Sequence, residues 1–202
     1  MTVHSFSSAA GAAAPLTRAR VSGSLPVWSL SLGCPKNRVD TEHLLGSLGM
    51  PVHSVEHMGR ARLVFINTCG FIEPAVRESI RSILDAVERL GRCKRRPLLA
   101  VAGCMVGRYG VKDLAADLPE VDLWLPTGEL ENWPAMVREA LGLPAAPAAP
   151  GRLLSTGPSY AWLKVGEGCR HKCAFCTIPS IRGPLRSVPA ADLREEARGL
   201  LA

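Results

Sequence analysis

The sequence predicts an α/β fold with a mainly parallel sheet, followed by the first strand and helix of a second, incomplete unit. Between residues 27 and 141, short apolar runs alternate with stretches of helical periodicity. Such alternation is typical of strands joined by right-handed helical crossovers, with helices on both faces of the sheet. A Pro/Ala-rich segment, 144–150, then separates this domain from one more apolar run and one more helical stretch.

The strands are predicted from short apolar runs bounded by turn-forming residues. These runs cover residues 27–32, 52–57, 63–67, 98–102, 121–125 and 161–165. The run at 52–57 is weak, whereas the run at 63–67 is strong. The first five runs are assigned to the parallel sheet, and the sixth opens the second unit.

The helices are predicted from apolar side chains that recur every three or four residues. Asp40 is the expected N-cap of the first helix, which shares one apolar face among Leu44, Leu45 and Leu48. The second helix begins near Pro74, and its apolar stripe consists of Val76, Ile80, Ile83, Leu84, Val87 and Leu90. Further helices are expected at 108–118, 133–141 and 189–201.

The chain divides into four segments. Residues 1–26 form an expected disordered leader, because they contain Ala and Ser runs but lack the compact apolar core of a signal peptide. The α/β domain occupies 27–142, a Pro/Ala linker 143–159, and the start of the second domain 160–202. A single strand and helix cannot bury their own apolar faces, so we expect this last segment to belong to something larger.

Composition excludes several classes of protein. No apolar stretch reaches the roughly 20 residues of a membrane helix, so no spanning segment is expected. The net charge of +6 allows an anionic partner such as RNA but does not require one. Seven cysteines without a secretion signal indicate a cytoplasmic protein whose thiols bind metal or take part in chemistry rather than form disulfides.

Three cysteines lie within eight residues near the C-terminus: Cys169, Cys173 and Cys176. At this spacing their thiolates can surround one metal centre. A 4Fe-4S cluster usually takes four thiolates, so three would leave one iron open to another ligand. The alternative is a structural zinc site with His171 as the fourth ligand. We favour the cluster, because His171 lies two residues from each neighbouring cysteine and would have to fold back sharply.

Three other cysteines are spread through the first domain: Cys34, Cys69 and Cys104. Each follows a predicted strand within one or two residues, and each lies next to a glycine. Carboxyl ends of parallel strands share one edge of the sheet, so these thiols are predicted to converge and hold a second cluster. The alternative is three buried core cysteines. Cys93, in the basic stretch 92–96, is interpreted as an incidental exposed thiol in a solvated loop.

The C-terminal motif, Cys-x3-Cys-x-Phe-Cys, resembles the signature of the radical S-adenosylmethionine (SAM) enzymes. The resemblance implies that SAM chelates the open iron of the cluster at Cys169, Cys173 and Cys176. It also implies that Phe175 packs beside the adenine. The implied fold is a βα barrel, of which residues 160 onward would form the first βα unit.

Together, the two cysteine sets resemble those of the methylthiotransferases, and the local sequence is similar to the RimO branch of that family. The resemblance rests on Ser31–Asn37 with Asp40–Glu42, Asn67–Ile72, Ala102–Cys104 with Arg108–Gly110, Pro119–Asp122, Thr127–Glu129 and Ile178–Gly183. The transfer-RNA branch typically has Gln-Met-Asn after its first cysteine, where this chain has Pro35-Lys36-Asn37.

This resemblance implies a chemistry that needs both clusters, because replacing an unactivated C–H bond by C–S lies beyond acid–base catalysis. The C-terminal cluster would cleave SAM to a radical that takes hydrogen from the β-carbon of an aspartate in ribosomal protein S twelve of the small subunit. The auxiliary cluster at Cys34, Cys69 and Cys104 would hold the sulfur for transfer. A flavodoxin or ferredoxin would serve as reductant.

Family members continue through the rest of the barrel and a C-terminal TRAM domain, whereas this chain stops after one barrel unit. We therefore expect a fragment that binds the auxiliary cluster but does not turn over. Two alternative functions remain at this point. One is methylthiolation of an adenosine in transfer RNA, and the other is a non-catalytic Fe–S or zinc binding module.

Overall fold

A five-stranded parallel sheet forms the centre of the N-terminal domain in the computed structural model, which describes residues 23–145 and 151–201. The strand order is β2-β1-β3-β4-β5, and every neighbouring pair is parallel. The bounds are β1 Leu25–Ser31, β2 Val52–Ser54, β3 Leu63–Thr68, β4 Leu98–Gly103 and β5 Leu123–Pro126. The predicted parallel sheet is confirmed. Residues 1–22 of the expected leader and 146–150 of the expected linker lie outside the described residues.

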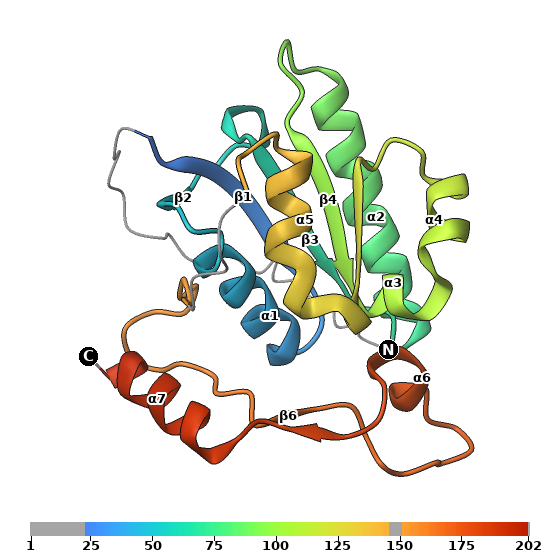
Figure 1. The fold of residues 1–202 in the computed structure, drawn as a ribbon. Coiled ribbons are helices and arrows are strands. Elements are labelled where there is room, and N and C mark those ends of the chain that lie inside the picture. Colours follow the sequence, from blue (N-terminus) through green and yellow to red (C-terminus); the bar gives the residue numbers. More distant parts are fainter. Residues whose placement is uncertain (1–22, 146–150, 202) are drawn as a thin grey trace, which may run out of the picture.

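Helices cover both faces of the sheet (Figure 1). They are α1 Pro35–Gly46, α2 Glu73–Gly91, α3 Cys104–Tyr109, α4 Val111–Asp117 and α5 Trp133–Ala140, with 3-10 turns η1 Met58–Arg60 and η2 Thr127–Asn132. Strand β3 is buried along its whole length. Its Leu63 and Phe65 pack towards α1 and α5, whereas Val64 and Ile66 pack towards α2 and α4. Two apolar layers therefore fix the register of the sheet.

The N-cap of the first helix lies six residues earlier than predicted. Pro35 occupies its first turn and Cys34 is its N-cap, so Asp40 lies inside the helix rather than at its start. The helix predicted at 108–118 is instead divided into α3 and α4 at Gly110, whose φ is 82°. In α2, Ser79 and Ala86 occupy core positions, while Ile80 and Leu84 of the predicted stripe remain exposed.

Residues 151–201 lie along the end of the domain where the β-strands terminate (Figure 1). A short antiparallel pair joins β6 Gly166–Glu167 to β7 Arg186–Ser187, and the helices are α6 Ile178–Arg182 and α7 Ala190–Leu201. The helix predicted at 189–201 is confirmed. The strand predicted at 161–165 was wrong in position, since pairing begins only at Gly166. Within the described residues, no helix is both long and apolar enough to cross a membrane.

Helix α1 buries polar side chains on the face that is turned away from the sheet, because residues 151–156 cover it. Glu42 is 1% exposed, and it forms an ion pair with Arg152 at 2.7 Å and accepts a hydrogen bond from the Ser155 backbone at 2.9 Å. The Leu153 N–H also donates to the Glu42 carbonyl at 3.0 Å. Buried ions are stable only when paired in this way, so α1 depends on the C-terminal segment for its partners.

His43 on α1 makes the contact with α7 sensitive to pH. Its Nε2 lies 3.1 Å from Glu196 Oε1, and its pKa lies below 6.5 because burial, together with Arg152 and Lys164, outweighs the attraction of Glu196 and Asp40. A neutral imidazole that donates to Glu196 satisfies this geometry. Since the folded pKa is lowered, the unfolded chain binds the proton first, and stability is lost as pH falls below about 6.5.

We therefore expect the free energy of unfolding to decrease between about pH 7.5 and pH 5.5, and His43→Gln to weaken that decrease. Urea unfolding at several pH values measures it, with His57→Gln at an exposed position as the matched control. An identical pH profile in wild type and His43→Gln would show that His43 does not contribute.

Candidate metal centre

The three cysteines of the first domain follow three neighbouring strands at the same edge of the sheet. Cys34 is the N-cap of α1, Cys69 follows β3, and Cys104 opens α3 directly after β4. The parallel register pairs Ser31 with Asn67 and Thr68 with Gly103, so the strands end at matched positions. The predicted convergence of the three turns at one sheet edge is thus what the topology produces.

Glycines let these turns approach one another closely. A Cβ added to Gly33 would lie 2.8 Å from the Cys69 Sγ, and one added to Gly70 would lie 2.8 Å from the Cys104 carbonyl carbon. Gly33 also has a φ of 83°, a conformation that side-chain-bearing residues rarely adopt. The turns that carry Cys34, Cys69 and Cys104 therefore pack against each other.

Polar side chains from α1 and α2 hold the turns in place. Asn37 Nδ2 donates to the Leu32 carbonyl at 2.8 Å and to the Thr68 carbonyl at 2.9 Å, which ties the ends of β1 and β3 together. The Ser79 hydroxyl accepts from the Cys69 N–H at 3.0 Å and lies 2.9 Å from the Cys69 carbonyl, to which it donates. The core position of Ser79 on α2 thus fixes the backbone of Cys69.

The three thiols differ in exposure: Cys34 is exposed, Cys69 is half-buried and Cys104 is buried. Burial raises the pKa of the Cys104 thiol, since it disfavours the thiolate. The Arg182 guanidinium opposes this effect, because its Nε lies 3.1 Å from the Cys104 Sγ. The neighbouring Cys69 and Cys34 raise the pKa further.

The side chains at this edge are a donor set of three thiols, the kind of ligand that holds iron–sulfur clusters. Across the part of the chain that the structure describes, no three His, Cys, Asp or Glu side chains gather around one position that suits a single metal ion. The nearby carboxylates of Asp40 and Glu167 are already paired with Lys164 and Arg182. Thiolates are therefore the ligands that this edge offers.

The C-terminal cysteines share one loop, between β6 and α6. The Cys169 N–H donates to the Gly183 carbonyl at 3.2 Å, and the Cys176 N–H donates to the Cys173 carbonyl at 3.0 Å. Cys173 is exposed, and Cys169 and Cys176 are half-buried. Phe175, which is expected to contact an adenine ring, is 90% exposed. This loop offers three accessible thiols.

Comparison with known proteins agrees with these features. Residues 27–126 match the model described as "Uncharacterized protein family UPF0004". The chain is 65% identical over 178 residues to the "Ribosomal protein uS12 methylthiotransferase RimO" of Nitratidesulfovibrio vulgaris strain DP4, which covers 88% of the chain. The chain belongs to the RimO branch of the methylthiotransferases.

Proteins of the same name in Lawsonia intracellularis and Geobacter sulfurreducens are 51% and 40% identical over 180 and 190 residues. These alignments cover 89% and 87% of the chain. The chain spans about 41% of the length of the RimO relatives that it matches. The similarity to these proteins therefore extends over most of the chain.

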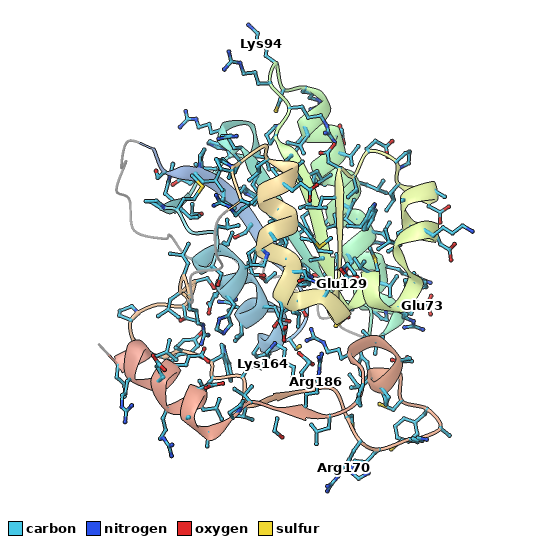
Figure 2. All side chains as sticks on the ribbon, in the orientation of Figure 1. Glu73, Lys94, Glu129, Lys164, Arg170 and Arg186 are labelled. Carbon is cyan, nitrogen blue, oxygen red and sulfur yellow. The ribbon has the colours of Figure 1, made fainter. Side chains whose placement is uncertain are left out.

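A group of charged and polar residues, none of them predicted as site residues from the sequence, lies beside the cysteines of the first domain: Asn37, Asp40, Lys164, Glu167 and Arg182. Arg182 is 5% exposed, and it contacts Asp40 at 3.2 Å and Glu167 at 2.7 Å. Figure 2 shows Lys164 at the junction between the C-terminal segment and the domain above it. Asn37, Asp40 and Arg182 lie inside the segments that resemble the family, and this position is the sequence feature that could have identified them as site residues.

Cys93 lies apart from both cysteine sets of this RimO-type chain. The sequence predicts an exposed thiol, but Cys93 is half-buried, because it packs against the apolar layer under α2. Its Sγ lies 3.5 Å from the Arg89 carbonyl. The following basic loop, marked by Lys94 in Figure 2, projects at the opposite end of the molecule from the C-terminal segment. Cys93 therefore offers a natural control for experiments on the other cysteines.

Proposed function

We propose that this chain is part of a RimO-type methylthiotransferase that carries two 4Fe-4S clusters. The observation that carries the proposal is the meeting of three cysteine-bearing turns at one sheet edge, in a chain 65% identical to a RimO protein. Residues 27–142 would form the auxiliary-cluster domain, 143–159 a linker, and 160–202 the start of the radical SAM domain.

Each cysteine set has a separate role in this proposal. Cys34, Cys69 and Cys104 would hold the auxiliary cluster, and Cys169, Cys173 and Cys176 would hold the cluster that binds SAM. When bound, the clusters and SAM supply the radical and sulfur-transfer chemistry that side chains lack. Asn37 and Ser79 keep the first set in position through their backbone hydrogen bonds. Phe175, on the second loop, would pack against the SAM adenine.

The proposed substrate is the β-carbon of an aspartate in ribosomal protein S twelve, on the protein itself or on the small ribosomal subunit. The RimO relatives carry this protein, uS12, in their names. A flavodoxin or ferredoxin would supply electrons, and the reaction would take place in the cytoplasm.

Deletion of the gene that encodes the chain tests this proposal. Mass spectrometry of ribosomal protein S twelve from the deletion strain should show complete loss of the methylthio group, while transfer RNA keeps its own. A gene copy carrying Cys104→Ala should fail to restore the modification, whereas Cys93→Ala should restore it. Loss of methylthio groups from transfer RNA alone would reject the proposed substrate. No loss from either would favour a non-catalytic binding module.

A further inference from the structure

Arg182, at the C-terminal end of α6, directs its guanidinium at a cysteine of the first set. It is buried, and its Nε donates to the Cys104 Sγ at 3.1 Å. Its Nη2 donates to the Asn37 Oδ1, an atom that also lies 3.8 Å from the same sulfur. The planar guanidinium can donate in several fixed directions at once. The Nε–H group of Arg182 therefore donates to the Cys104 sulfur rather than to a carboxylate.

The ion pairs around Arg182 contain one more positive than negative charge, next to the Cys104 sulfur. Two carboxylates, Asp40 and Glu167, face the guanidinium, with Nη1 at 3.2 and 2.7 Å. Both also pair with lysines: Lys164 contacts both carboxylates, and Lys36 Nζ lies 3.4 Å from Glu167. Three cations therefore face two carboxylates. An anionic thiolate ligand at Cys104 would balance the group.

The same turn also contacts the second cysteine set. The carbonyl of Gly183, the residue after Arg182, accepts the Cys169 N–H at 3.2 Å. The Thr127 hydroxyl donates to the Ile181 carbonyl at 2.6 Å and anchors α6 to the first domain. Close packing at this anchor leaves little freedom, since a Cβ on Gly107 would lie 2.9 Å from the Ile181 carbonyl oxygen. Residues 181–183 thus touch both sites through a fixed turn.

We propose that Arg182 is a positioning residue that raises the reduction potential of the cluster bound by Cys34, Cys69 and Cys104, through its N–H···S hydrogen bond to Cys104. This inference rests on the proposed function, because it requires that cluster. Hydrogen bonds to ligand sulfurs and nearby positive charge stabilise the more negative, reduced state of an iron–sulfur centre. Removing the donor should therefore make the cluster harder to reduce.

The test uses the full chain with Cys169, Cys173 and Cys176 all replaced by alanine, so that only the first set binds a cluster. After anaerobic reconstitution, a potentiometric titration followed by electron paramagnetic resonance gives the midpoint potential. At the midpoint of the parent, Arg182→Gln should lower the ratio of reduced to oxidised cluster about tenfold, a shift of about 59 mV to more negative potential. Arg182→Lys keeps the charge but loses the Nε–H donor, so it should shift less in the same direction.

Arg194→Gln, which removes the same charge at an exposed site on α7, is the matched control and should keep the parent potential. A retained cluster with unchanged potential in Arg182→Gln would overturn the inference. Should that variant lose its cluster, an unchanged potential in Arg182→Lys would overturn it instead. Absence of any cluster in the parent would overturn the proposed function and the inference that rests on it, which separates the two failures.

Discussion

Replacing Cys34, Cys69 and Cys104 together by alanine is expected to halve the iron of the anaerobically reconstituted chain, from about eight to about four atoms per chain. The three turns meet at one sheet edge, so the variant removes every thiolate that this edge offers. Thiolates on the separate loop of Cys169, Cys173 and Cys176 remain. Iron and acid-labile sulfide analysis measures the loss.

Two matched variants make this result specific. Cys93→Ala removes a thiol outside both sets and should keep about eight irons. The complementary variant, with Cys169, Cys173 and Cys176 replaced by alanine, should keep about four. Unchanged iron in the first triple variant would show that the strand-end cysteines are structural. One or two zinc ions without iron in the wild type would reject both cluster assignments.

Gly103→Ala is expected to lower the free energy of unfolding by about 2 to 6 kcal/mol. Gly103 has φ 102° and ψ −160°, a backbone region that is essentially restricted to glycine. A Cβ there would also overlap the Asn67 Oδ1 and the Thr68 carbonyl oxygen. Because Gly103 precedes Cys104, the strained turn should also reduce the iron bound by the first cysteine set. Urea unfolding measures the first effect and iron analysis the second.

Alanine substitutions at two other glycines distinguish the cost of backbone strain from the cost of steric overlap of the added Cβ. Gly110→Ala meets the same backbone conformation, with φ 82° and ψ 152°, but has open space around its Cβ, so it should cost only about 1 to 3 kcal/mol. Gly128→Ala meets neither problem and should change stability little. Equal stability of the Gly103→Ala and Gly128→Ala variants would contradict the packing described for the turn before Cys104.

Local sequence patterns predicted the sheet and the cysteine edge because both follow from short-range rules. Apolar runs at 63–67 and 98–102 are buried on both faces and could be only central strands. Once the strands are parallel and neighbouring, a cysteine just after each one must lie at the same edge. The shared edge position of Cys69 and Cys104 could therefore be predicted from their places directly after two strands, without any information on long-range contacts.

Features that depend on contacts distant in the sequence were missed. Asp40 looks like an N-cap, but it lies inside α1 and faces Arg182, 142 residues further along the chain. The apolar run at 161–165 has the composition of a strand, yet strand pairing requires a neighbour, and β7 pairs only with Gly166 and Glu167. Buried charges such as Glu42 and Arg182 have no periodic signature, because their partners decide whether burial is tolerated.

Anomalous diffraction from crystals of the anaerobically reconstituted chain, measured on both sides of the iron absorption edge, tests the central claim most directly. The claim is that the edge formed after β1, β3 and β4 binds a 4Fe-4S cluster. The expected result is an iron-specific density of cluster size bounded by the Sγ atoms of Cys34, Cys69 and Cys104. Iron density confined to the Cys169–Cys176 loop, or density at the zinc edge alone, would contradict it.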